Sequence, residues 1–204
     1  SHQLKTPLAA LNIYNGLLQG ETKGDSQLHE VAALSEKELE RIETLIQNLL
    51  KIAKLDAGSI VFEQAWENVA DMMGEVELHF AYRAEQEVKE LVFEGNDEIK
   101  LFCDRIWMME AVENLVKNAL DHTEKGDFIQ IHWRTSASMV QILIKDNGKG
   151  IHPEDLHYIF KRFYRSRFSQ DQQGIGLGLP LAKMIVEAHG GTIEVDSESG
   201  AGAA

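Results

Sequence analysis

The chain has 204 residues, a formal net charge of −13 and one cysteine, with 44% hydrophobic and 26% charged residues. This balance indicates a globular protein with a buried core, neither disordered nor fibrous. The acidic excess argues against a nucleic-acid-binding surface and against contact with anionic membranes, because both need clustered basic residues. A single cysteine excludes a disulfide framework, and no apolar run approaches the roughly 20 residues of a membrane span.

The first 58 residues predict a pair of helices. Apolar residues recur at helical spacing from Leu4 to Leu18, residues 20–26 form a polar break, and a longer apolar stripe runs from Leu28 to Ile52. Two amphipathic helices joined by a short turn form an antiparallel hairpin. Because a hairpin cannot bury both stripes alone, we expect a homodimer with a four-helix bundle, with docking on the chain's own second domain as the alternative.

From Ser59 onward the pattern alternates between helical and extended segments. Expected helices cover residues 66–85, 105–122 and 179–189, the second one with Asp104 as its N-cap. Expected strands cover residues 90–93, 100–103, 128–133, 139–145 and 192–195. The predicted fold is therefore an all-α helical hairpin over residues 1–58, followed over residues 59–204 by an α+β two-layer sandwich with mostly antiparallel strands and helices on one face.

The first segment that can carry chemistry is residues 1–8. His2 and Thr6 lie about one turn apart, opposite the apolar stripe of the first expected helix. A neutral imidazole in that position has a free ring nitrogen and can act as a nucleophile. Pro7 would kink the helix beside it. Taken alone, an exposed histidine on a helix is more often only a surface residue.

The second segment is the expected helix 105–122. Asn114 and Asn118 are four residues apart and share one face of it. Side-chain oxygens at that spacing could bind a hard cation such as Mg²⁺, which prefers a few protein oxygens together with phosphates and waters. A pair of surface amides is the simpler interpretation of these two residues alone.

The third segment is residues 146–151, directly after an expected strand. An Asp-Asn-Gly sequence at a strand end first indicates a turn. The Asp146 carboxylate at that position, beside glycines, could also accept a hydrogen bond from an adenine amino group.

The fourth segment is the glycine-rich run at residues 174–181, which precedes an expected helix. Glycines there leave backbone N–H groups free to meet phosphate oxygens, but the lysine and hydroxyl residue of a P-loop are missing. Residues 160–167, just before this run, combine aromatic and basic side chains beside the polar residues 169–173. In so acidic a chain, this local basicity indicates an anionic ligand or a solvated loop.

In their order and spacing these segments resemble the catalytic core of the sensor histidine kinases of bacterial two-component systems. The motifs that carry the resemblance are a histidine box at residues 1–8, an asparagine box at 114–123, glycine boxes at 146–151 and 174–179, a phenylalanine box at 159–165, and residues 189–192.

The resemblance implies a dimerisation and phosphotransfer hairpin over residues 1–58 and an ATP-binding domain of the Bergerat type over residues 59–204. His2 would take the γ-phosphoryl group of ATP and pass it to an aspartate of a response-regulator receiver domain. Gln3 would orient the imidazole, and Thr6 would help position water for dephosphorylating the regulator. Arg162 and Arg165 would balance phosphate charge during transfer.

The resemblance also implies a nucleotide site in which Asn118, with Asn114, holds Mg²⁺ and phosphates and Asp146 reads adenine. The expected binding residues are Asn114, Lys117, Asn118, His122, Asp146, Gly148, Gly150, Ile151, Gly174, Gly176, Leu177, Gly178 and Leu179.

The sequence departs from the family pattern at two of these places. Gln3 stands where Glu or Asp is common, and an amide cannot take the imidazole proton. Asp121 stands where Lys is often found, and its charge would repel phosphates unless it points away or Lys117 compensates. The start one residue before His2 and the end at Ala204 suggest that the chain is truncated, and the resemblance implies a cytoplasmic fragment of a membrane-anchored parent.

Two alternatives remain open at this stage. An ATPase of the gyrase and chaperone type shares the nucleotide boxes but has a Glu four residues before the metal-binding Asn. Here that place is Asn114, and Glu113 lies about 100° around the helix from it. The other alternative is a non-catalytic dimeric scaffold that binds a regulator, for which Gln3 and Asp121 are the only support.

Overall fold

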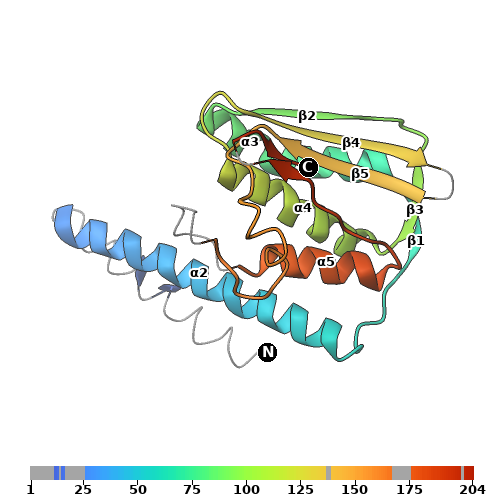
Figure 1. Cartoon of the computed structure of the whole chain (residues 1–204). Coiled ribbons are helices and arrows are strands. Elements are labelled where there is room, and N and C mark those ends of the chain that lie inside the picture. Colours follow the sequence, from blue (N-terminus) through green and yellow to red (C-terminus); the bar gives the residue numbers. More distant parts are fainter. Residues whose placement is uncertain (1–11, 14, 17–25, 137–138, 167–175, 199) are drawn as a thin grey trace. The chain divides into compact units, whose positions relative to one another are not determined.

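The computed structural model describes residues 12–13, 15–16, 26–136, 139–166, 176–198 and 200–204, and Figure 1 shows the whole chain. The chain divides into two compact units, residues 1–57 and residues 58–204. In the part of the chain so described, no helix combines the length and the apolar character that crossing a membrane would need.

The first unit is dominated by helix α2, Ser26–Asp56, which contains the predicted apolar stripe. Residues 12–13 and 15–16 are also helical. The buried Asn15 side chain donates a hydrogen bond from Nδ2 to the carbonyl of Ala32, at 2.7 Å. This contact joins the first arm to α2, as the hairpin prediction requires. Leu34 and Ile42 of α2 remain 62% and 39% exposed, so the unit leaves apolar surface uncovered.

The second unit alternates strands and helices. Its helices are α3 (Val69–Glu87), α4 (Arg105–His122) and α5 (Gly178–Ala188). Its strands are β1 (Ala65–Asn68), β2 (Glu90–Gly95), β3 (Lys100–Cys103), β4 (Phe128–Ser136), β5 (Met139–Asp146), β6 (Ser197–Glu198) and β7 (Gly202–Ala203).

The central sheet has the strand order β2-β4-β5 and is mixed. β4 and β5 form the predicted antiparallel hairpin, whereas β2 runs parallel to β4, with Glu90 opposite Phe128. The chain reaches β4 from β2 through β3 and α4, and such a crossover returns a strand in the same direction. The expectation of mostly antiparallel strands therefore misses the β2–β4 pair.

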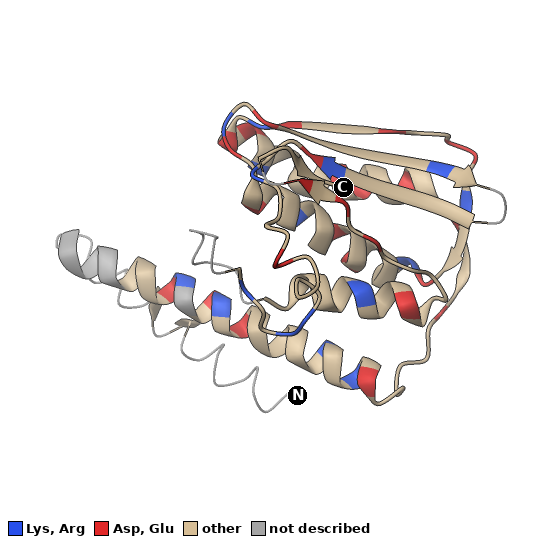
Figure 2. Ribbon diagram, in the orientation of Figure 1, with Lys and Arg blue, Asp and Glu red and all other residues tan. Residues whose placement is uncertain are grey.

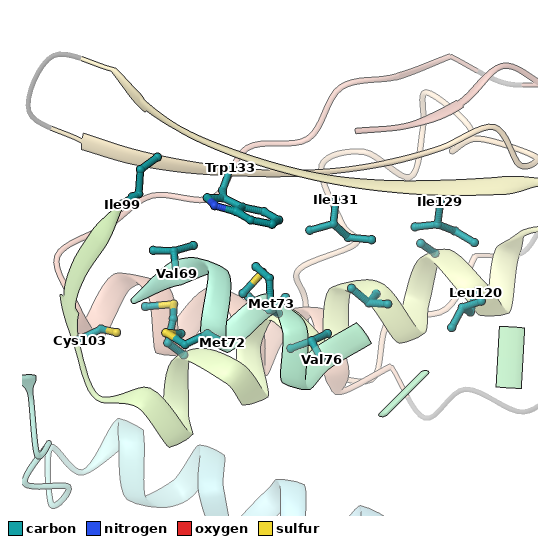
Figure 3. Close-up of a cluster of buried hydrophobic side chains, with 14 of the residues drawn as sticks. Val69, Met72, Met73, Val76, Ile99, Cys103, Leu120, Ile129, Ile131 and Trp133 are labelled. Atoms are coloured by element: carbon teal, nitrogen blue, oxygen red, sulfur yellow. The ribbon is translucent and has the colours of Figure 1, made fainter. Parts of the chain in front are cut away.

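The core lies between this sheet and the helices on one of its faces, as the two-layer prediction requires. Figure 1 shows α3 and α4 together on that face. Alternate residues of β4 point into the core, and Figure 3 shows them meeting side chains of α3 and α4. The buried residues drawn there include Met72, Met73, Val76, Leu120, Ile129, Ile131 and Trp133. Burial of these large apolar groups is the main source of stability for this unit.

A two-stranded ribbon sets where α3 and α4 begin. β1 and β3 pair antiparallel, and each leads directly into a capped helix. The Asn68 side chain accepts a hydrogen bond from the N–H of Asp71, at 3.0 Å, and Asp104 accepts one from Trp107, at 3.2 Å. The predicted Asp104 cap is confirmed. The predicted helix start at Trp66 is wrong, because residues 66–68 are the end of β1.

The predicted strand at residues 192–195 is also wrong. These residues pair with no described strand, and backbone pairing begins only at Asp196, which exchanges two hydrogen bonds of 2.9 and 2.8 Å with Ala204. Alternation still leaves Ile193 and Val195 half-buried. Alternation describes the two faces of an extended segment, but a strand also needs a neighbouring backbone.

Candidate functional site

The described members of the predicted site come from four places in the second unit: the C-terminal half of α4, the loop after β5, residues 162–165, and the start of α5 with the two residues before it. His2, Gln3, Thr6 and Gly174 lie outside the described residues.

Asp146 ends β5 and is only 8% exposed. The backbone N–H of Gly148 donates a hydrogen bond to Asp146 Oδ1, at 2.9 Å. Burial raises the pKa of the Asp146 carboxyl, and hydrogen bonds from the backbone of Gly148 and Ala203, with the neighbouring His122, only partly oppose this shift. The loop therefore holds a largely desolvated acceptor in a fixed orientation, which suits recognition of an amino group.

The first glycine box packs against the end of α4. A Cβ atom on Gly148 would lie 2.4 Å from the carbonyl oxygen of His122, and the N–H of Lys149 donates to that same oxygen at 3.4 Å. Only glycine allows this approach at position 148. Asp146 and His122, which lie far apart in the sequence, are thereby brought together, while Ile151 is half-buried further along the loop.

The hairpin of β6 and β7 supports this loop from the other side. Gly150 and Gly202 have φ values of +65° and +93°, and a Cβ atom on them would lie 2.1 Å from the Glu198 carbonyl oxygen and 2.0 Å from that of Asp146, respectively. Ser197 Oγ accepts a hydrogen bond from the N–H of Ile151, at 2.8 Å, and donates to the carbonyl of Gly202, at 2.7 Å.

Ser197 and Gly202 are absent from the predicted site. The only sequence signal for them is the pair of glycines at positions 200 and 202, which indicates a tight turn near the end of the chain. Nothing in that turn signal says that it folds onto residues 146–151.

One of the two asparagines of α4, Asn114, lies beside the second glycine box. Asn114 donates from Nδ2 to the carbonyl of Glu110, at 2.8 Å, and its Oδ1 faces Gly178, where a Cβ atom would lie 2.9 Å away. Asn118 is half-buried and makes no side-chain hydrogen bond to any described residue. These amide oxygens are donors of the type that Mg²⁺ prefers, so the residues present fit that ion.

The first turn of α5 has no side-chain cap at Leu177, so its backbone N–H groups lack that partner. Leu177 is buried and Leu179 half-buried. Because both side chains are apolar, only backbone groups of these two residues can bind a polar ligand. Lys117, by contrast, is an exposed cation on α4. An uncapped helix N-terminus preceded by glycine is suited to an anion.

The basic segment before the second glycine box is attached to α5. Phe163, with φ +61°, donates its N–H to the carbonyl of Gly176, at 2.8 Å. Arg162 donates to the sulfur of Met184, at 3.4 Å, and borders an open groove of about 340 Å³. Arg162 thus lies against α5 further along than Gly178, and Arg165 is exposed.

Glu113 and Asp121, the two carboxylates of α4 that bear on the alternatives and on phosphate binding, both face α3. Glu113 lies 2.6 Å from Nδ1 of His79, and Asp121 lies 2.6 Å from Nη2 of Arg83. Glu113 is therefore not aimed at the face that carries Asn114, where the gyrase-type alternative needs a base. Asp121 points toward α3, which is the condition under which its charge is tolerated. Figure 2 shows acidic and basic residues interspersed along the ribbon of the described residues.

Two protein families match the chain. Residues 1–58 match the His Kinase A (phospho-acceptor) domain, and residues 103–204 match the histidine kinase-, DNA gyrase B-, and HSP90-like ATPase family. The sensor histidine kinase CusS of Escherichia coli O157:H7 is 32% identical over 201 residues, which cover 98% of this chain and 42% of CusS. The chain thus spans less than half the length of this relative.

Solved histidine kinases share the fold. Full-length ShkA in complex with AMPPNP has a TM-score of 0.83 at 22% identity, covering 99% of this chain and 42% of ShkA. ThkA in complex with the response regulator TrrA has a TM-score of 0.72 at 21% identity, covering 99% of this chain and 57% of the ThkA chain. At these identities the likeness concerns the fold.

Proposed function

We propose that this chain phosphorylates itself on His2 with ATP. The premise is that the chain belongs to the histidine kinase-, DNA gyrase B- and HSP90-like ATPase family and is the catalytic core of a two-component sensor histidine kinase. The phosphoryl group then passes to an aspartate of a response-regulator receiver domain.

One observation carries this proposal: the fold brings a buried acceptor, Asp146, and a pair of amide oxygens on α4 into the same domain as the uncapped start of α5. The loop of Asp146 touches α4 at His122, and Asn114 touches α5 at Gly178. A purine, a metal ion and a phosphate chain need these three kinds of group. The histidine box at the start of the chain supplies the acceptor for the phosphoryl group.

In the proposed reaction an imidazole nitrogen of His2 attacks the γ-phosphorus of ATP. The bond from that phosphorus to the bridging oxygen breaks, ADP leaves, and the imidazole proton passes to solvent or a base. Gln3 orients the ring but cannot take this proton. In the second step an aspartate oxygen of the regulator attacks the phosphorus and the bond to His2 breaks.

Each predicted residue has a proposed part in binding. Asp146 accepts the adenine amino group, with Gly148, Gly150 and Ile151 lining the same loop. Asn118 and Asn114 hold Mg²⁺, which when bound neutralises phosphate charge. Lys117, Arg162 and Arg165 supply further positive charge, and His122 closes the end of α4. The second glycine box, residues 174–179, contributes its backbone N–H groups.

The partner and the setting are also proposals. ThkA was solved with a response regulator, and we infer that a receiver domain is the partner of this chain as well. We propose that Thr6 supports dephosphorylation of that regulator, and that the chain works as a homodimer. The remaining proposal, a cytoplasmic core in a membrane-anchored sensor, concerns the longer protein, since the chain spans 42% of CusS.

The test is incubation with Mg²⁺ and γ-labelled ATP. The wild-type chain should acquire acid-labile, alkali-stable label, and His2→Ala should acquire none. His79→Ala is the control, because His79 is 61% exposed on α3 and pairs with Glu113 away from the nucleotide groups. Phosphate release without labelled protein would favour the gyrase-type ATPase instead, and a stable dimer with neither activity would favour the scaffold.

A further inference from the structure

Asp121 places a negative charge close to the proposed phosphate site. It follows Asn118 by three residues on α4, and side chains at that spacing are neighbours on a helix surface, about 5–6 Å apart at Cβ. A free carboxylate there would repel the triphosphate of ATP. The fold must therefore compensate for this residue if the site is to bind nucleotide, and the inference rests in this respect on the proposed function.

Arg83 of α3 provides the compensation. Its Nη2 donates to Asp121 Oδ1 at 2.6 Å, and its Nε donates to Glu87 Oε1 at 2.7 Å. The Arg83 guanidinium thus joins α3 to α4. The Arg83 side chain is 33% exposed and that of Asp121 is 28% exposed. A pair shielded to this extent is screened by salt less than a fully exposed one. Burial lowers the pKa of Arg83, but the hydrogen bonds to Glu87 and Asp121 raise it overall, so the group stays charged.

Lys89 also contacts this turn of α4. Its Nζ donates to the carbonyl of Leu120, at 2.6 Å, and to Glu87 Oε2, at 2.5 Å, and its side chain is only 8% exposed. Lys89, Glu87, Arg83 and Asp121 form a continuous chain of charges. A cation on the last carbonyls of a helix also favours the helix dipole.

We propose that Arg83 is a positioning residue for nucleotide binding. It neutralises Asp121 and turns its carboxylate toward α3, so that the last turns of α4 present Asn118 and Lys117 to the phosphates without an opposing charge. Arg83 itself contacts neither the asparagines nor the glycine boxes among the described residues.

Arg105 offers a matched control at the opposite end of the same two helices. It also links α4 with neighbouring carboxylates, at 2.6 Å from Glu75 of α3 and 3.2 Å from Glu67 of β1. It precedes Asn118 by 13 residues, which is about 20 Å along a helix. Losing this arginine removes a similar ion-pair bridge without exposing a carboxylate near the phosphates.

The experiment measures the Kd of the full chain for Mg²⁺-ATP by titration calorimetry at low salt. Arg83→Met should weaken binding about tenfold, the scale of one unit charge placed a few ångström from an ionic ligand at a protein surface. Arg83→Lys should recover part of the loss, and the double variant Arg83→Met with Asp121→Asn should recover most of it. Arg105→Met should leave the Kd unchanged. Near 1 M salt, where the Debye length is about 3 Å, the Arg83→Met defect should largely disappear.

A Kd for Arg83→Met equal to that of the wild type would overturn the proposal, as would a double variant no better than Arg83→Met. The second result would assign Arg83 a purely structural role. If Arg83→Met does not fold, Asp121→Asn alone decides: it should bind Mg²⁺-ATP equally well or a few-fold more tightly, and weaker binding would contradict the proposal. Failure of the wild-type chain to bind would instead overturn the proposed function, and the inference with it.

Discussion

At the scale of single residues, burial of the Asp146 carboxylate lowers the stability of the folded chain. This carboxyl is buried, and burial raises its pKa although two backbone N–H groups and His122 favour the charged form. An acid whose pKa is raised by folding makes its full contribution to stability below its unfolded value of about 3.9, and this contribution is lost as pH rises through the folded value. At neutral pH the ionised carboxylate therefore works against folding.

Asp146→Asn should accordingly separate stability from nucleotide binding. At pH 7 the free energy of unfolding should be equal to or above that of the wild type, because the desolvated charge is gone while the amide oxygen still accepts from Gly148. Affinity for ATP should fall about 10–100-fold, the value of a hydrogen bond to a charged group. Urea unfolding between pH 4 and 8 and calorimetric titration measure the two effects. The stability difference should shrink toward the acid end, and a variant that is less stable at pH 7 would contradict this interpretation.

At the scale of elements, the start of α4 is held by residues from elsewhere in the chain. Asp104 caps its first turn and also accepts the N–H of Glu63, at 2.9 Å, through Oδ2. The N–H of Asp104 donates to Nε2 of His189, at 3.1 Å, so that Nδ1 of this ring is left to donate to the carbonyl of Ile185, at 2.8 Å. The histidine of the last motif thus ties the end of α5 to the start of α4, which sets the spacing between the elements of the candidate site.

The β2–β4 pair gives a prediction for stability. Gly95 lies opposite Trp133, and a Cβ atom on it would lie 2.3 Å from the indole ring, whose Nε1 donates to the carbonyl of Asn96. Gly95→Ala should lower the free energy of unfolding by about 1–3 kcal/mol through overpacking. Gly74→Ala, in the middle of α3 with open space around it, should instead raise it by about 1 kcal/mol. Chemical denaturation compares the two, and equal effects would refute the packing argument.

At the scale of the whole molecule, the two units differ in how completely they bury their apolar surface. The second has its own core between α3, α4 and the central sheet, whereas Ala32 and Ile52 are the only buried hydrophobic residues among the described residues of the first, where Ile13, Leu34 and Ile42 remain 64%, 62% and 39% exposed. Exposed apolar side chains at helical spacing favour association with another helix pair. This observation supports the proposed homodimer.

The full chain should therefore be a dimer in solution, and a fragment of residues 58–204 should be a monomer that still binds ATP. Leu34→Glu combined with Ile42→Glu should convert the full chain to monomer without changing its affinity for ATP, since both changes lie in the first unit. Light scattering coupled to size-exclusion chromatography gives the mass, and titration with ATP gives the affinity. A monomeric wild-type chain, or a dimeric fragment, would contradict the prediction.

The sequence by itself determined the family, the order of the motifs and most element positions. Helix 105–122 with its Asp104 cap, the hairpin of β4 and β5, and the strand at residues 100–103 were predictable because caps and alternation are encoded within a few neighbouring residues. Even the start of α3 was misplaced by only a few residues, since the helical pattern does not show where Asn68 caps.

Only the tertiary structure decided the features that join distant segments. These include the parallel pairing of β2 with β4, the β6–β7 hairpin beneath Asp146, the unpaired residues 192–195, and the turn of Asp121 toward Arg83. Each depends on which backbone or charge another part of the chain brings near. Local periodicity carries no information about such a partner, so the Asp121 carboxylate could face a nucleotide or, as here, pair with Arg83, which precedes it by 38 residues.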